Sequence, residues 1–228
     1  MHDVTFPQSG SKRKLLDVAE QLFAENGFEA VSVRDITQLA KANVASVNYY
    51  FGSREALLAM VMARHLVPVS EERLAKLDLI EKRWAGKLPP LEELIDAMVQ
   101  PLLGQVKKSD LSERLFYKLM GRIFAQQGDG LPPAIENQLT RTNDRFTRAF
   151  GKALSSLSAE DLALRIHFVT GGLIQILSKQ DVMQGPSGGA CSMEATLERF
   201  IRFASAGLRE GIEVTDKATK SPQAIFDF

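Results

Sequence analysis

Residues 43–54 carry the side chains of this chain whose types and spacing best suit recognition chemistry. The segment reads NVASVNYYFGSR, with small and polar residues first and paired tyrosines in the middle. Serine and asparagine can hydrogen-bond to base edges, and tyrosine and arginine can donate to phosphate oxygens. Because its first residues are slim, a short helix here could bring its tip deep into the major groove of DNA. The segment therefore predicts a DNA contact.

A preceding short helix is expected to hold this segment in place. Ser32 and Asp35 have the spacing of a capping box, which predicts a helix start. Apolar residues follow at helical spacing, at Val33, Ile36, Leu39 and Ala40. A helix this short needs a packing partner, and an amphipathic segment over residues 12–26, ended by Gly27, is the nearest one.

The second short helix is predicted over residues 44–51, with Asn43 as its N-cap. Val44, Val47 and Phe51 fall at i, i+3 and i+7, which assigns them to the buried face, although Val44 is also a candidate base contact. Ser53 is expected to cap a further helix, and Pro68 is expected to end it.

These residues resemble the DNA-binding domain of TetR-family transcriptional regulators. The resemblance is carried by AEQLFAENGFEAVSVRDI, by the turn, and by NYYFGSREALL, within about the first 60 residues. Tyr50 and Arg54 stand where the family commonly has histidine and lysine. The resemblance implies base contacts by Asn43, Val44, Ala45, Ser46 and Asn48, and phosphate contacts by Ser32, Arg34, Tyr49, Tyr50 and Arg54.

Two of these assignments have structural alternatives. Tyr49 and Tyr50 could instead pack in the small core of the N-terminal helices. Lys12, Arg13 and Lys14 begin the first helix and could reach a flanking phosphate, or could form a solvated helix start.

The charge balance is unusual for a nucleic-acid-binding chain. Lysine and arginine number 28 and so do aspartate and glutamate, and residues 1–55 hold six basic and seven acidic residues. Nonspecific binding to DNA requires a positive excess. We therefore expect modest nonspecific affinity, a few well-placed donors, and acidic residues that face away from DNA.

Composition and motifs argue against other classes of protein. A single cysteine, Cys191, excludes an intramolecular disulfide and fits a reducing, cytoplasmic environment. No apolar window is long enough for a membrane span, and no signal peptide is evident. His2, His65 and His167 lack metal-ligand spacing, and no nucleophile or phosphate-loop motif occurs, so we expect no catalytic site, metal or cofactor. The rival interpretations are an enzyme with a helical active site and a dimeric interaction module that no longer binds DNA.

The fold class expected is all-α, with an N-terminal three-helix helix-turn-helix domain and a C-terminal helical domain for ligand binding and dimerisation. The domains are predicted at residues 1–55 and 56–213, with a flexible tail at 214–228. Helices are expected over residues 70–84, over 90–106 with either a kink or a gentle bend at Pro101, over 110–127 with Asp110 as its cap, and over 132–157. Basic residues at 141, 145, 148 and 152 form a stripe that is either solvated or open to an anionic ligand.

The last two predicted helices, about 158–181 and 193–210, are apolar on more than one face. Such helices must be buried on more than one side, which favours a two-fold homodimer built on four helices. Two recognition helices related by that symmetry predict a near-palindromic operator and a repressor that an effector releases. Seven residues are candidate effector contacts, although each could be an ordinary core residue: Trp84, Phe116, Tyr117, Met120, Phe124, His167 and Gln175. Their side chains suggest an apolar or aromatic effector. His167 and Gln175 could instead form hydrogen bonds across the dimer interface.

Overall fold

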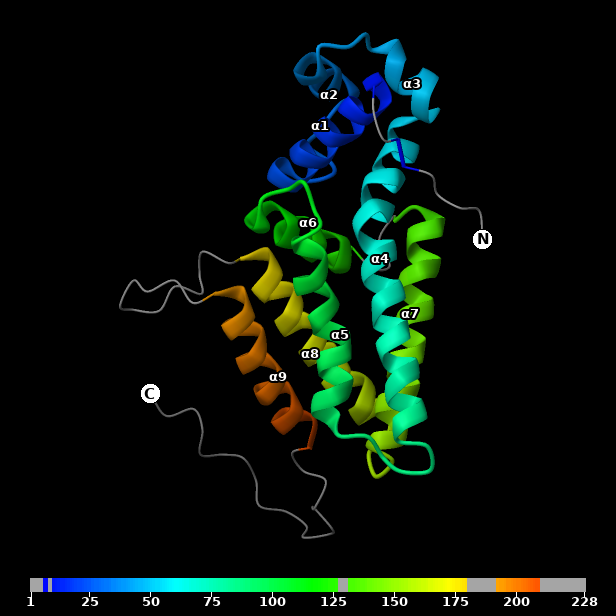
Figure 1. Ribbon diagram of the computed structural model, residues 1–228, viewed down its shortest axis with the longest axis vertical. Coiled ribbons are helices and arrows are strands. Elements are labelled where there is room, and N and C mark those ends of the chain that lie inside the picture. Colours follow the sequence, from blue (N-terminus) through cyan, green and yellow to red (C-terminus); the bar gives the residue numbers. More distant parts are fainter. Residues whose placement is uncertain (1–5, 8–9, 127–130, 180–191, 210–228) are drawn as a thin grey trace, which may run out of the picture.

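The computed structural model describes residues 6–7, 10–126, 131–179 and 192–209, and the elements within them are helices. In chain order they are α1 (Gly10–Asn26), α2 (Val33–Ala40), α3 (Ala45–Phe51), α4 (Arg54–Arg83), α5 (Leu91–Val106), α6 (Glu113–Ala125), α7 (Pro133–Ala153), α8 (Ala159–Ser178) and α9 (Met193–Arg209). Figure 1 shows α1–α3 as a head at one end of the molecule and the remaining helices as a larger body. The predicted all-α fold class, with a small N-terminal unit and a larger helical one, is confirmed.

The N-terminal unit (α1–α3) forms from the local signals that the sequence carries. The Ser32 hydroxyl accepts a bond from the Asp35 amide, and the Asp35 carboxylate accepts from the Ser32 amide, so the capping box is confirmed. Gly27 follows the last residue of α1 with a φ of +97°, a conformation that favours glycine. Ile36 of α2, Val47 of α3 and Phe23 of α1 are fully buried and belong to the same core.

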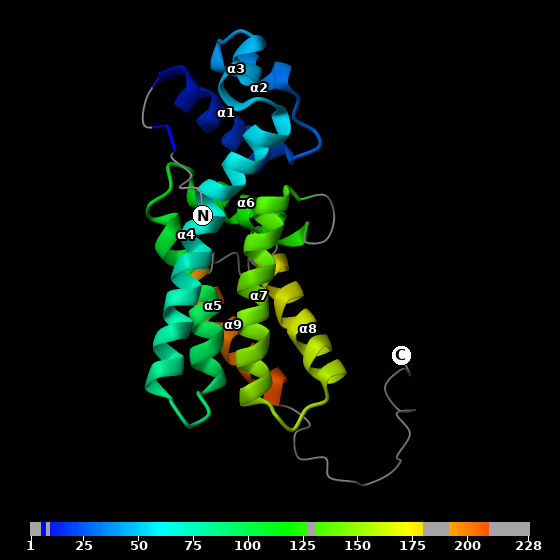
Figure 2. The same cartoon turned by 90° about the vertical axis from the view of Figure 1, so that its right-hand side faces the viewer.

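Helix α4 is the element that joins the two units. It runs for 30 residues from the head to the far end of the body (Figures 1 and 2). Ser53 caps it through the Ala56 amide at 3.0 Å, as predicted. The prediction that Pro68 ends this helix is wrong, as is the separate helix expected to begin near residue 70. An internal proline costs about 3 kcal/mol, but buried residues on both sides of Pro68 stabilise the continuous helix by more than that.

The start of α6 also differs from the expectation. Ser112, not Asp110, caps it, and its hydroxyl accepts from the Leu115 amide at 3.4 Å. Asp110 lies in the segment before the helix and binds two arginines instead. Local spacing cannot distinguish two possible caps when one of them has a distant ionic partner.

The body packs α4 against α5 and α7, and α6 against α8, with α9 packed on α5 and α8. Figure 2 shows α4, α5 and α7 running alongside one another. Helix α8 has 20 residues and is capped by Ser158, which accepts from the Asp161 amide. No helix in the described ranges is long and apolar enough to cross a membrane. The predicted tail at 214–228 lies outside the described residues.

Candidate nucleic-acid interface

Helix α3 presents its first turn and Tyr49 to solvent while its other side is fixed in the core. Val47 is fully buried, whereas Tyr49 is 82% exposed. The alternative in which Tyr49 packs in the core is therefore wrong. Tyr50 is half-buried, with its ring edge-on to Tyr49 at 4.9 Å and to Phe51 at 6.5 Å.

Val44 is the position at which the predicted face must be corrected. It was assigned to the buried face, but 51% of it is exposed. Helix α3 begins one residue later than expected, and Val44, not Asn43, is its N-cap; its backbone is helical, but its side chain at the helix start stays exposed. Asn43 still satisfies a helix-start donor, since its side-chain oxygen accepts from the Ala45 amide at 2.9 Å. Leu39, placed in the apolar run of α2, is also exposed, at 52%.

The candidate phosphate donors differ in whether their side chains already form hydrogen bonds within the protein. Arg34 is exposed at the start of α2. Ser32 donates its hydroxyl to Asp35 at 2.6 Å, and these hydrogen bonds lower the pKa of Asp35. Arg54 donates to the carbonyls of Val31, at 2.9 Å, and of Phe28, so its guanidinium braces the loop between α1 and α2. The phosphate contacts of these residues stay predictions.

The remaining base-edge candidates lie where α3 and its preceding turn are open. Asn43, Ala45 and Asn48 are exposed, and Ser46 is half-buried. The turn is made by Lys41, which ends α2 in the left-handed conformation with φ of 51°. The two short helices joined by this turn leave one edge of the N-terminal unit open to contact with a DNA groove.

The basic start of α1 divides between two directions. Lys12 lies with its Nζ 5.5 Å from the centre of the Phe51 ring. Arg13 binds Asp17 and Asp110 instead, so it points toward the body of the protein. Arg13 therefore matches neither of the two predictions for this segment, a solvated helix start or a contact with a flanking phosphate.

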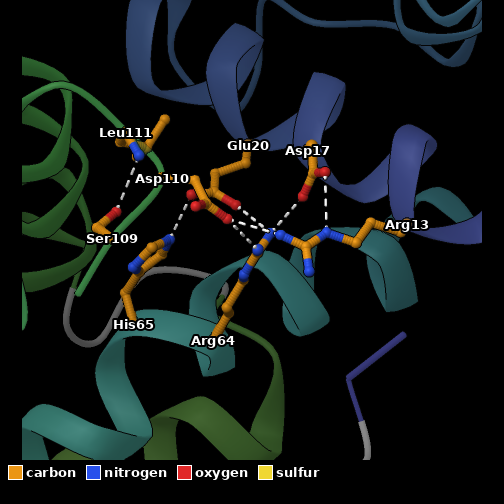
Figure 3. A network of polar contacts seen from close by, with 8 residues as sticks. All are labelled: Arg13, Asp17, Glu20, Arg64, His65, Ser109, Asp110 and Leu111. Carbon is orange, nitrogen blue, oxygen red and sulfur yellow. Dashed lines mark hydrogen bonds and ion pairs between the residues drawn. The ribbon is translucent and has the colours of Figure 1, made fainter. Parts of the chain in front are cut away.

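Arg13 belongs to a network that we call the α1–α4 polar cluster, drawn in Figure 3. Its ionisable members come from α1, from α4 and from the segment before α6: Arg13, Asp17, Glu20, Arg64, His65 and Asp110. Arg64 lies at its centre, with Nη1 2.6 Å from Asp17 and 2.7 Å from Glu20, and Nη2 3.2 Å from Asp110. Burial acts to lower the pKa of Arg64, but the hydrogen bond to Asp17 and the surrounding acidic charges outweigh it and raise that pKa.

Glu20 is the buried member of the cluster, with 2% of its side chain exposed. One carboxylate oxygen lies 2.7 Å from Arg64 and the other 2.7 Å from His65 Nε2. The ring of His65 meets Phe116 of α6 edge-on at 5.6 Å. Two of the acidic residues of the N-terminal unit, Asp17 and Glu20, are thus turned toward the body.

A second set of contacts joins the other end of α1 to α6. Lys118 donates to the Glu25 carbonyl at 2.9 Å, and Arg122 donates to the carbonyls of Phe23 and Glu25 at 3.3 and 3.2 Å. Cations at the carboxyl end of a helix also interact favourably with its dipole. The N-terminal unit is therefore held at both ends of α1.

The candidate effector contacts fall in separate places. Phe116, Tyr117 and Met120 of α6 are fully buried, and Phe124 nearly so. Trp84 lies at the far end of α4, where its indole donates to Glu93 at 3.1 Å. His167 and Gln175 are exposed on α8, so they do not join the α6 group within one protomer.

An apolar groove of about 550 Å³ runs between α8 and α9. Phe168 and Phe203, which are 65% and 77% exposed, line it together with Gln175 and the backbone at Gly172. The inner residues of α8, such as Leu173 and Leu177, are buried. The two helices therefore cover one face with their own protomer and leave a second apolar face open.

Two family models match this chain in succession. Residues 15–61 match the model for bacterial regulatory proteins of the tetR family, and residues 96–207 match the tetracyclin repressor-like C-terminal domain. The chain belongs to the TetR family. The first match covers the helix-turn-helix and the start of α4, and the second covers most of the body.

Curated relatives of this TetR-family chain align over part of their length. It is 38% identical over 60 residues to the HTH-type transcriptional repressor KstR2 of Rhodococcus jostii, which is 26% of this chain and 29% of that protein. It is 28% identical over 143 residues to the repressor KstR of the same organism, covering 62% of this chain and 60% of that protein. The chain thus matches less than two thirds of the length of either repressor.

Solved structures share the fold at low sequence identity. A TetR-like transcriptional regulator from Rhodococcus sp. RHA1 superposes with a TM-score of 0.57 and 20% identity over 90% of this chain and 98% of that one. A TetR-family regulator from Bordetella parapertussis gives 0.56 and 16% over 89% and 96%. These likenesses support the TetR fold for the whole described chain.

The residues that sequence reasoning missed are those of the α1–α4 polar cluster. Glu20 and Arg64 are separated by 44 positions, and Arg13 and Asp110 by 97. Each is an ordinary charged residue on an amphipathic helix or in a connecting segment. No pattern within a single helix distinguishes them, so only the packing of α1 on α4 reveals them.

Proposed function

We propose that this TetR-family chain is a DNA-binding transcriptional regulator that acts in the cytoplasm as a homodimeric repressor and is released by a small effector. The observation that carries the proposal is the outward presentation of the start of α3 on a unit that is tied at both ends of α1 to the helical body. The exposed Val44 and Tyr49 beside the buried Val47 support a recognition surface on a fixed base.

The proposed DNA contacts follow the exposure of the side chains. Base edges are read by Asn43, Val44, Ala45, Ser46 and Asn48, and phosphates are held by Ser32, Arg34, Tyr49 and Tyr50. Arg54 is the weakest member of the phosphate set, since its guanidinium already serves two backbone carbonyls. Its contribution is to hold the loop before α2 in position.

The proposed dimer forms through α8 and α9. The groove between them is apolar, and Leu164, Phe168 and Phe203 are large apolar side chains left exposed. A two-fold axis would bury the same face of both protomers. The two α3 helices would then reach major grooves about 34–36 Å apart, or a related spacing, on a near-palindromic operator.

Effector binding is proposed to act through the core of the body. A small apolar or aromatic molecule that favours one arrangement of α4 and α6 would change the position of α1, because both helices contact it. A ligand with different affinities for the two arrangements shifts the DNA-binding equilibrium by that difference.

Selection from random duplexes with the purified chain tests this function. We expect enrichment of one near-palindromic motif, bound by a dimer, and loss of that enrichment for Asn48→Ala. Arg148→Ala, an exposed change on α7, is the matched control and should select the same motif. Recovery of no preferred duplex over bulk competitor would refute the proposal and favour an interaction module.

A further inference from the structure

Arg73 is a buried cation without an acidic partner among the described residues. It lies on α4 with 5% of its surface exposed. Its Nε donates to the Met98 carbonyl of α5 at 2.7 Å, and its guanidinium lies 4.9 Å from the centre of the Phe124 ring of α6. A guanidinium has five N–H donors, and the carbonyl of Met98 is the acceptor that the described part of the chain gives it.

This arrangement is costly for the free protein. Burial lowers the pKa of Arg73 to about 10, so the group is still charged at neutral pH. Burying a charge removes its favourable hydration, and a nearby opposite charge normally offsets that loss. Where no such charge is present, replacement by an apolar side chain of similar volume is often stabilising. A group kept at such a cost is a candidate for a functional role.

Two further buried hydroxyls, one on α4 and one on α6, are left unsatisfied. The hydroxyls of Ser70 and Tyr117 are the buried side-chain polar atoms in the described ranges that lack a hydrogen-bond partner. Ser70 precedes Arg73 by one turn, on the same face of α4. Tyr117 precedes Phe124 by two turns on α6, and burial, with the charges of Glu113 and Glu194, raises its pKa, so it remains a neutral donor.

We propose that Arg73 binds the anionic group, a carboxylate in the simplest case, of an otherwise apolar effector, and that Ser70 and Tyr117 donate to its remaining polar atoms. Guanidinium and carboxylate form paired hydrogen bonds that a neutral ligand cannot reproduce. Phe116, Met120 and Phe124 are buried apolar side chains of α6, and the body of the ligand would pack against them. The inference rests on the proposed effector response and narrows its chemistry to amphipathic acids.

The site also connects to the N-terminal unit. Helix α6 carries Tyr117 and Phe124 toward the core and Lys118 and Arg122 toward the carbonyls at the end of α1. An acid that draws α4 and α6 together would therefore act on the helix that supports α2 and α3.

The first test needs no ligand and uses thermal unfolding of Arg73→Met. Methionine fills a similar volume without charge, so we expect an unchanged or higher melting temperature. Arg148→Met removes the same charge from the surface and controls for net charge. A melting temperature several degrees lower for Arg73→Met than for Arg148→Met would show that the charge stabilises the folded chain without a ligand and would overturn the proposal.

The second test measures ligand-induced shifts with octanoate, decanoate, benzoate and 2-naphthoate against their methyl esters and octylamine. We expect at least one acid to raise the melting temperature of the natural chain by about 2 °C or more, with no shift from its ester or from the amine, and no shift for Arg73→Met. Equal shifts from esters, shifts retained in Arg73→Met, or no shift from any acid would overturn it. Duplex selection is scored separately. Acid binding without a preferred duplex would therefore refute the proposed regulator function while supporting the proposed Arg73 site.

Discussion

Removing the carboxylate of Glu20 tests how the N-terminal unit is held on the body. In the structure this side chain is 2% exposed and lies 2.7 Å from both Arg64 and His65. Breaking a buried ion pair by removing one partner costs about 3–5 kcal/mol. Arg64 keeps Asp17 and Asp110 in the variant, so we expect Glu20→Ala to cost about 3 kcal/mol, at the lower end of that range.

The matched control is Asp17→Ala, which removes a second carboxylate of the same cluster. Asp17 is 41% exposed, so its ion pair with Arg64 is screened by solvent and contributes at most about 1 kcal/mol. For a chain of this size the shift in melting temperature is roughly 2–4 °C per kcal/mol. Circular dichroism melts at physiological salt should therefore show a loss of about 6–12 °C for Glu20→Ala and about 4 °C or less for Asp17→Ala.

Equal losses of melting temperature for the two variants would refute the reasoning. They would mean that burial does not determine how much each ion pair contributes to stability. The two melts should also respond differently to salt. Raising the ionic strength should reduce the effect of Asp17→Ala and leave that of Glu20→Ala largely unchanged, since buried pairs are screened less than exposed ones.

Four further perturbations test other parts of the account. Gly27→Ala should cost about 1–2 kcal/mol in urea unfolding, because φ is +97° there and the added methyl group would also overlap the Arg122 guanidinium. Tyr49→Ala should leave stability within about 0.5 kcal/mol, since the side chain is 82% exposed, while weakening binding to the selected duplex about tenfold in gel-shift titrations. Asp35→Asn should be less stable than the natural chain at neutral pH; because the folded-state pKa of Asp35 is lowered, that difference should begin to shrink as the pH falls through about 4, the unfolded value, and vanish only below the lowered folded-state pKa, so a difference that does not change with acidification would contradict the capping role. Phe168→Glu should convert the proposed dimer to monomer in sedimentation velocity, whereas a dimer that is unchanged by the substitution would contradict an interface at this groove.

The sequence predicted those features of the fold that depend on neighbouring residues. Ser32 with Asp35, Gly27 and Ser53 each mark a helix end in the structure as they do in the sequence. A cap or a helix stop is decided within about one turn of backbone, so the residues involved lie within a few positions of each other.

The sequence could not predict features that depend on distant contacts. Asp110 has the spacing of a cap, yet its carboxylate binds Arg13 and Arg64, and Ser112 takes the capping role. Val44 has helical backbone angles one turn before Val47, yet half of it is exposed because it precedes the first residue of α3 and lies at the edge of the small core. The isolation of Arg73 likewise becomes visible only when α5 and α6 are packed around it.

Pro68 shows how these distant contacts organise the molecule. Within α4 it lies between Arg64 and His65, which hold α1, and Ser70 and Arg73, which face the core. Its missing N–H leaves the Arg64 carbonyl without its helical partner, so α4 is most easily bent between those two pairs.

The body therefore contacts α1 through two different helices. Helix α4 binds the first half of α1 through the polar cluster, and α6 binds the carbonyls at its end through Lys118 and Arg122. A displacement of α6 relative to the upper part of α4 would push the two ends of α1 unequally and so turn it. Since α2 and α3 pack on α1 and on the start of α4, such a turn would change the direction in which α3 faces. In the proposed two-fold dimer, a change of direction in each protomer would alter the spacing of the two α3 helices.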